Sequence, residues 1–259
     1  MVERNHHAGV VTLWAPERPE AGRPLALSDE ECQHARVRRL GPGSVVRLVD
    51  GAGTVAMGTL VKLSRHQGIV DVAEAHAVDR LSAVHLLLPV ADRDRMLWLA
   101  EKAAELGLTS WRPVMWQRSK SVSPRGEGMT FQGKVRARMM SALKQSGGAW
   151  LPELHPEASV AHAIAAAPEG CRMVLDAAGA PITAHPVAPP VTIAVGPEGG
   201  IEPDEHALLV ASGFAPASLG PTTLRFETAG IVALGAVRAA LSGPGTAAAS
   251  RSAAVFPSS

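Results

Sequence analysis

The chain has 259 residues, of which 46% are hydrophobic and 19% are charged, and its net charge is +1 at pH 7. This composition is typical of a globular protein with one large domain or two smaller ones. No apolar run approaches the ~20 residues that span a bilayer, and the first residues lack the apolar core of a secretory signal. Cys32 and Cys171 lie far apart without metal-ligand spacing. We therefore expect a cytoplasmic protein with neither a membrane anchor nor a metal site.

The first part of the chain is rich in predicted strands. An apolar strand at Val45–Val49 is followed by a turn at Asp50–Gly53 and a return strand at Thr54–Val61. Another strand follows at Gly68–Ala73. These short strands predict a small β-barrel, and we expect the first domain to span residues 1–76.

One short helix is predicted inside this domain, at Ser28–Leu40. It opens with a capping serine and acids in its first turn, and it closes with arginines followed by Gly41 and Pro42. The residues from His76 to Ser82 predict a linker to the next domain.

From Ala83 onward, apolar strands alternate with helical patterns. Val84–Val90 has the composition of a strand that is buried on both faces. Apolar residues at helical spacing then predict a helix over Asp92–Leu106, with Gly107 as its stop. The further predicted elements are a strand at Ser110–Trp116, a basic helix at Phe131–Ser146, and strands at Arg172–Asp176 and Val191–Val195.

This alternation predicts an α/β domain over residues 83–243, with a parallel sheet and helices on both faces. Residues 244–259 are rich in Ala, Ser, Pro and Gly, and we expect them to form a disordered tail.

Three stretches of the chain contain basic residues and no acid, namely 32–49, 106–126 and 128–152. Most of the bases are arginines, whose planar fork suits phosphate. Any one stretch could be an ordinary solvated face, but three together favour a polyanionic partner such as nucleic acid. The candidate RNA contacts are Arg36, Arg38, Arg39, Arg118 and Lys120. Trp111 and Trp116 could stack on bases, although their alternation on a strand favours core packing.

Two loops near the carboxyl end point to a small-molecule site. The strand Val191–Val195 runs into Gly-Pro-Glu-Gly-Gly at 196–200, and a second glycine-containing loop begins at Ser218. In a parallel sheet both loops would meet at the edge where α/β folds bind ligands. The first loop lacks the patterns of a P-loop or a dinucleotide site, but Gly199 and Gly200 let the backbone approach a ligand closely. Taken alone, such a loop is also compatible with a plain structural turn.

These motifs resemble a known family. The pair GPEGG (196–200) and SLGPTTLRFETA (218–229), the segment EKAAELG (101–107), KQS (144–146) and HARVRRL (34–40) are together similar to the RsmE family of 16S ribosomal RNA (uracil-N3) methyltransferases, members of the SPOUT superfamily. The resemblance covers nearly the whole chain except its tail.

The resemblance implies a C-terminal SPOUT-type α/β domain with a trefoil knot and an N-terminal PUA-like RNA-binding domain. It implies S-adenosylmethionine as cofactor, a homodimer, a role in ribosome biogenesis, and 16S rRNA or the assembled small ribosomal subunit as partner. The cofactor-binding residues that it implies are Leu175, Gly196, Pro197, Glu198, Gly199, Gly200, Ser218, Leu219, Gly220, Leu224 and Arg225.

The chemistry of methylating uridine N3 suggests three catalytic candidates. The nitrogen must lose its proton, because a neutral imide is a weak nucleophile. Arg225 could stabilise the charge that develops on the uracil carbonyls. Glu227 could orient Arg225 or act as the base, and Glu198 is the rival base. The plainer alternatives are that Glu227 compensates a helix dipole and that Arg225 only forms a salt bridge.

Three positions depart from the family pattern. Asp92 and Arg93 stand where the family has a Lys-Gly pair. The arginine that normally follows Q-S-G is absent, leaving Gly148 and Ala149, and Thr222 replaces another arginine. Two alternative functions therefore stay open. One is a SPOUT methyltransferase that acts on tRNA or large-subunit rRNA, and the other is a non-catalytic rRNA-binding assembly protein. The intact loop at 196–200 favours the enzyme.

Overall fold

The computed structural model of the chain describes residues 10–119 and 126–242. It divides into two compact units. The N-terminal unit contains residues up to Arg80 together with Met139–Leu151, and the C-terminal unit contains Leu81–Arg138 and residues from Pro152 onward. The predicted tail at 244–259 and Lys120 lie outside the described residues. In the part of the chain that is described, no helix is long and apolar enough to cross a membrane.

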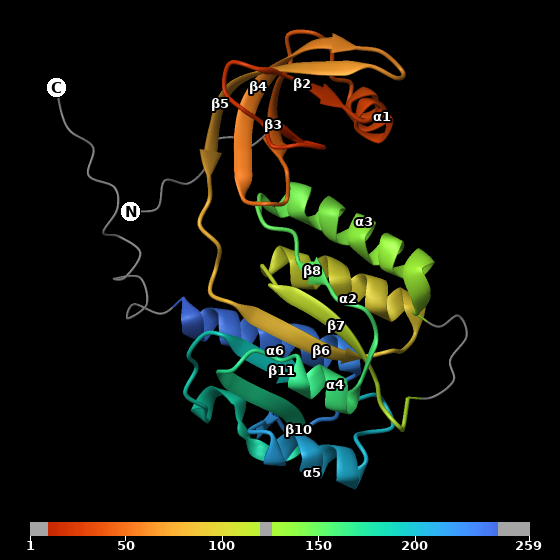
Figure 1. Cartoon of the computed structure of the whole chain (residues 1–259), viewed down its shortest axis with the longest axis vertical. Coiled ribbons are helices and arrows are strands. Elements are labelled where there is room, and N and C mark those ends of the chain that lie inside the picture. Colours follow the sequence, from red (N-terminus) through yellow and green to blue (C-terminus); the bar gives the residue numbers. More distant parts are fainter. Residues whose placement is uncertain (1–9, 120–125, 243–259) are drawn as a thin grey trace, which may run out of the picture. The chain divides into compact units, whose positions relative to one another are not determined.

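The N-terminal unit is a curled five-stranded sheet (Figure 1). Its strands pair in the order β1-β3-β4-β5-β2, with β1 parallel to β3 and the other neighbours antiparallel. The strands are β1 (Val11–Trp14), β2 (Pro24–Leu27), β3 (Val45–Val49), β4 (Thr54–Leu63) and β5 (Gly68–Ala77). Three of the five were predicted from their apolar patterns, whereas β1 and β2 have only four residues each and were not.

Helix α1 (Asp29–Val37) packs against this core through its buried residues. The Ser28 side chain accepts a hydrogen bond from the Glu31 backbone N–H, so the predicted cap is present. The helix stops three residues before the predicted end, and Arg39 then adopts a positive φ of 59°. Cys32 and Ala35 are fully buried among strand residues such as Leu48.

Residues from far along the chain complete the N-terminal unit. Lys144, in the last turns of helix α3 (Gly128–Ser146), forms an ion pair with Glu31, which is only 3% exposed. Glu31 also accepts a hydrogen bond from the Trp14 backbone at 3.1 Å. The indole of Trp150 donates to the carbonyl of Val78 at 2.8 Å. A buried carboxylate is thereby paired and hydrogen-bonded, as its desolvation requires.

The C-terminal unit contains a fully parallel sheet in the order β12-β10-β11-β6-β7-β8, with β9 also paired to β7. The strands are β6 (Val84–Pro89), β7 (Ser110–Met115), β8 (Glu153–Leu154), β9 (Ala158–Ser159), β10 (Cys171–Pro181), β11 (Val191–Ala194) and β12 (Ala215–Ser218). The predicted parallel α/β domain is confirmed. The trefoil knot that the resemblance implies stays a prediction.

Helices cover both faces of this sheet. They are α2 (Arg93–Glu105), α4 (Val160–Ala165), α5 (Pro203–Ala211), the 3-10 helix η1 (Ile182–Ala184) and α6 (Phe226–Leu241). Leu87 packs in a core with residues of α4 and α5, such as Ile164 and Leu209. The next residue, Leu88, faces Gly230 of α6 and Leu99 of α2. The side chains of successive β6 residues therefore pack into two separate cores, one on each face of the sheet, which explains why this strand is apolar throughout.

Arg238 of α6 forms hydrogen bonds to backbone groups just before β6 and just after α2. Its guanidinium donates to the carbonyls of Ser82, Leu106 and Gly107. Burial lowers the pKa of Arg238. The side chain therefore provides donors for three backbone carbonyls at one end of the sheet.

Candidate functional site

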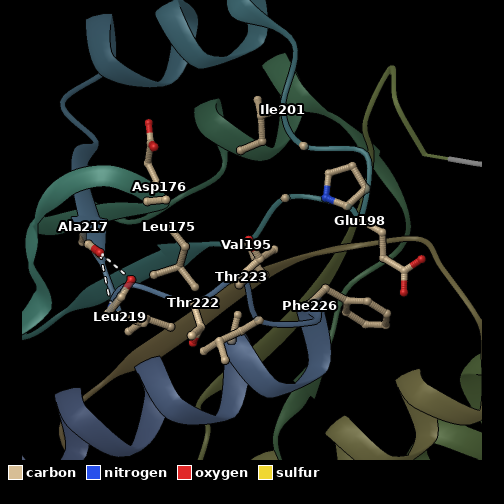
Figure 2. A pocket seen from close by; sticks show the side chains of 18 of the residues that line it. Leu175, Asp176, Val195, Glu198, Ile201, Ala217, Leu219, Thr222, Thr223 and Phe226 are labelled. Carbon is tan, nitrogen blue, oxygen red and sulfur yellow. Dashed lines mark hydrogen bonds between the residues drawn. The ribbon is translucent and has the colours of Figure 1, made fainter.

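One candidate site is a cavity of about 330 Å³ at the carboxyl edge of the sheet, beside β10, β11 and β12. Figure 2 shows part of its lining, with Leu175 and Val195 between Asp176 on one side and Glu198 with Phe226 on the other, and with Leu219 below Asp176 in this view. This is the sheet edge at which open α/β folds bind ligands. The predicted cofactor residues that line it are Leu175, Gly196, Pro197, Glu198, Gly200, Ser218, Leu219, Gly220 and Leu224.

The loop after β11 forms one wall of this cavity. A Cβ at Gly196 would lie 2.6 Å from a side-chain carbon of Ile201, so a larger residue cannot fit without displacement. Gly200 has a φ of +79°, and its N–H donates to the Pro197 carbonyl at 2.8 Å. This is a left-handed turn position that favours glycine.

Arg118 holds that loop from the segment after β7. Its guanidinium binds the Glu202 carboxylate at two points, and its Nη1 donates to the Gly199 carbonyl at 3.3 Å. The hydrogen bond to Glu202 raises the pKa of Arg118. Glu205, which is 6% exposed, accepts from the Gln117 backbone at 2.9 Å. The loop is thus preorganised by its neighbours.

The opposite side of the cavity carries an acid and a histidine. Nε2 of His206 lies 2.9 Å from Oδ2 of Asp176, within ion-pair distance but outside the geometry of a directed hydrogen bond. The other Asp176 oxygen accepts from the Ala178 backbone at 2.9 Å. Asp176 lies where β10 interrupts its pairing with β12, between Leu175 and Ala180. This bulge turns the carboxylate into the cavity wall.

The two candidate bases share one cation, Arg95 of α2. Its guanidinium contacts Glu198, and its Nε lies 3.8 Å from Oε1 of Glu227. Glu227 is 9% exposed, and its Oε2 has no hydrogen-bond partner among the described residues. Arg95 and Glu198 also line a second cavity of about 120 Å³, which shares Pro197, Glu198 and Phe226 with the first.

Other predicted site residues lie elsewhere. Gly199 lines the second cavity. Arg225 is the N-cap residue of α6, but its exposed side chain forms no capping hydrogen bond. It is not among the residues that line either cavity. The candidate RNA contacts Arg36, Arg38 and Arg39 are exposed at the end of α1. Trp111 and Trp116 are buried, which confirms core packing.

Sequence reasoning missed Asp176, His206, Thr223 and Arg95. An acid directly after an apolar strand was a usable signal for Asp176, and Thr223 lies within the motif at 218–229. Nothing local marks His206 or Arg95. Among the described residues, no group of three or more His, Cys, Asp or Glu side chains could hold a metal ion.

Comparison with known proteins agrees with this architecture. Residues 79–238 match a family described as an RNA methyltransferase domain, and residues 27–73 match an RNA methyltransferase PUA domain. The ribosomal RNA small subunit methyltransferase E of Mycobacterium bovis is 31% identical over 85% of this chain and 87% of its own length.

Two solved structures are also similar. A putative methyltransferase from Legionella pneumophila, in complex with S-adenosylmethionine, has a TM-score of 0.82 at 30% identity, over 89% of this chain and 98% of that one. The methyltransferase E of Neisseria gonorrhoeae has the same fold, with a TM-score of 0.81 at 24% identity over 89% and 97% of the two chains.

A PUA domain combined with a parallel α/β domain, whose glycine loops enclose a cavity at the carboxyl edge, defines the class as RNA methyltransferase. Within this class, the 31% sequence identity to a methyltransferase E, over most of both chains, indicates the family. The chain belongs to the ribosomal RNA small subunit methyltransferase E family, the RsmE family.

Proposed function

We propose that this chain transfers a methyl group from S-adenosylmethionine to N3 of a specific uridine in 16S rRNA. One observation carries the proposal: the glycine-loop cavity at the carboxyl edge adjoins a cluster of two carboxylates and an arginine. The cavity provides a place for a methyl donor, and the cluster provides a candidate base beside it.

The residues of the larger cavity fit S-adenosylmethionine. Leu175, Val195 and Leu219 offer apolar contacts for an adenine ring. The glycine loops expose amide and carbonyl groups that can bind its polar edge. Asp176 offers a negative charge to a ligand that carries a sulfonium and an ammonium group. The site therefore combines an apolar wall with a few oriented polar groups, as small-molecule sites do.

Glu198 is the better placed of the two candidate bases, because it lines both cavities. Its carboxylate takes the N3 proton and later releases it to water. Arg95, which already contacts Glu198, stabilises the negative charge that develops on the uracil carbonyls. When bound, S-adenosylmethionine supplies an electrophilic methyl carbon, so that the N–C bond forms as the C–S bond breaks and its electron pair stays on sulfur.

Further parts of the proposal concern partners. Exposed Arg36, Arg38 and Arg39 would hold phosphates of the rRNA or of the assembled subunit. We also propose a homodimer of the C-terminal domains, for which exposed Leu208, Val210 and Val232 are candidate contacts. A role on ribosomal RNA agrees with the cytoplasmic location expected from the sequence. Sedimentation of the purified protein would test the dimer.

The function is tested with small subunits from a strain that lacks the gene. Purified protein and labelled S-adenosylmethionine should produce 3-methyluridine in 16S rRNA, detected by nucleoside mass spectrometry, and should restore the reverse-transcription stop that deletion removes. Product in tRNA or large-subunit rRNA would favour the other RNA targets. Cofactor binding without any methyl transfer would favour an assembly protein.

A further inference from the structure

The smaller cavity adjoins the cofactor cavity but differs from it in size and lining. Its volume of about 120 Å³ is roughly a third of the 330 Å³ of its neighbour. It is lined by the segment Val90–Asp92, by Arg95 and Ser119, and by Pro197–Gly199 and Phe226. Because Glu198 and Phe226 belong to both walls, a ligand in one cavity would lie next to a ligand in the other.

We propose that this smaller cavity receives the flipped target uracil, and that Arg95, Glu198 and Ser119 together recognise its imide edge. The inference rests on the proposed methyltransferase function and deepens it. A base must leave the stack before its N3 can be reached. A single pyrimidine ring also has roughly a third of the non-hydrogen atoms of the cofactor, which agrees with the ratio of the two volumes.

The polar groups of the cavity complement uracil. The imide edge presents a carbonyl acceptor, an N–H donor and a second carbonyl acceptor. The guanidinium of Arg95 can only donate, the Glu198 carboxylate can accept the N3 proton, and a serine hydroxyl can donate. The Ser119 Oγ is buried and has no hydrogen-bond partner among the described residues. A buried hydroxyl without a partner is costly, so a ligand that accepts its proton would relieve that cost.

The same set of groups disfavours cytosine. Cytosine has an acceptor at N3 and an amino group where uracil has a carbonyl. Glu198 would face a lone pair and not a proton, and a donor of the cavity would face an amino group. A site built to bind one hydrogen-bonding pattern rejects a ligand that leaves its polar groups unpaired. The cavity therefore selects a base that has a removable N3 proton.

Glu227 is a positioning residue in this arrangement. It lies behind Arg95, with its Oε1 3.8 Å from the Arg95 Nε, and it lines neither cavity among the described residues. Its negative charge holds the guanidinium when the contact with Glu198 is exchanged for the uracil carbonyl. Loss of Glu227 should therefore weaken binding of the uracil base and leave binding of the cofactor unchanged.

The test compares Ser119→Ala and Arg95→Met with the control Arg93→Met, which lies two residues away on the same helix and lines neither cavity in the described structure. For both cavity variants, we expect kcat/KM on small-subunit RNA to fall about tenfold or more, with the Kd for S-adenosylmethionine unchanged. The control should behave as the wild type. Thermal unfolding of each variant checks that it is folded.

A second measurement needs no turnover. Saturation-transfer NMR with S-adenosylhomocysteine present should detect uridine 5′-monophosphate but not cytidine 5′-monophosphate on the wild type, and neither on Ser119→Ala. Glu227→Gln should weaken the uridine signal and leave cofactor binding intact.

Two outcomes would overturn the inference. The first is normal turnover and nucleotide binding in both cavity variants, and the second is equal binding of the two nucleotides by the wild type. If the wild type binds uridine 5′-monophosphate selectively but methylates no 16S rRNA, the base site stands and the proposed function fails.

Discussion

Arg118 and Glu202, which lie 84 residues apart in the sequence, form two parallel hydrogen bonds of 2.6 and 2.9 Å. The pair joins the segment after β7 to the loop that begins at Gly196. Arg118→Ala should weaken S-adenosylmethionine binding severalfold, because the loop loses its support. The unfolding free energy should change little, because the pair is partly exposed to water.

Arg118→Lys is the matched control, since it keeps the charge but not the two-point fork. We expect it to restore cofactor affinity only in part when both variants are measured by calorimetry. If both variants bind the cofactor as the wild type does and lose only RNA affinity, Arg118 is an RNA contact and not a support for the loop.

Asp176→Asn should raise the Kd for S-adenosylmethionine about tenfold. The substitution removes the negative charge from the cavity, while the amide oxygen can still accept from the Ala178 backbone. Asp71→Asn, at an exposed position in the N-terminal unit, is the control. Calorimetry checks the result, and unchanged affinity in Asp176→Asn would remove this residue from the cofactor site.

Two glycine substitutions, Gly200→Ala and Gly213→Ala, distinguish the effect of backbone strain on stability from an effect on cofactor binding. Both glycines have positive φ, +79° and +85°, and neither substitution creates a close contact. Each variant should therefore lose about 1 kcal/mol of unfolding free energy. Only Gly200 lines the cavity, so only Gly200→Ala should reduce cofactor affinity. Equal affinities in the two variants would contradict the assigned site.

Arg238→Met should destabilise the C-terminal unit by about 3 kcal/mol, because three backbone carbonyls lose their donors. Arg136→Met, at an exposed position of α3, should change stability little. Chemical denaturation monitored by circular dichroism gives both values. If Arg238→Met loses no more unfolding free energy than the control, water must replace the guanidinium as the hydrogen-bond donor to these carbonyls.

Glu101 gives the protein a pH-dependent contribution to stability. A hydrogen bond from Lys102 lowers the pKa of Glu101 below its ordinary 4.5, with Arg138 also contributing. The unfolded chain therefore takes up the proton first. The contribution is complete above pH 4.5 and is lost as the pH falls through the lower folded pKa.

Glu101→Gln should consequently be less stable than the wild type at neutral pH and approach it in acid. Melting temperatures between about pH 6 and pH 3 check this expectation. A constant difference across that range would contradict it, and Glu74→Gln, at an exposed position of β5, provides the control.

The sequence predicted most of the fold because the strands and helices carry strong local patterns. The apolar run at Val84–Val90 and the capping Ser28 each appear in the structure as expected. The two-residue strands β8 and β9 exist only because β7 lies beside them, and so few residues give no periodic signal.

The parts of the site that lie within one continuous sequence motif could be predicted. The parts that are brought together only by tertiary contacts could not. The glycine loop at 196–200, a candidate from its sequence, lines the two cavities. The association of Arg95 with Glu198 and Glu227 joins residues more than a hundred positions apart, which no local pattern encodes. Arg225 was a catalytic candidate from the sequence, but its side chain is exposed and it is not among the residues that line either described cavity.

The pairing of Lys144 with Glu31 limits how this protein can be divided. A fragment cut after residue 80 would keep the whole curled sheet, but it would lose Lys144. The Glu31 carboxylate, which is 3% exposed, would then be buried without its cation. Breaking a buried pair in this way typically costs about 3–5 kcal/mol, a large part of a small domain's stability. A graft or swap of the N-terminal unit among relatives would therefore have to include residues 139–151, which are not continuous with the rest of that unit in the sequence.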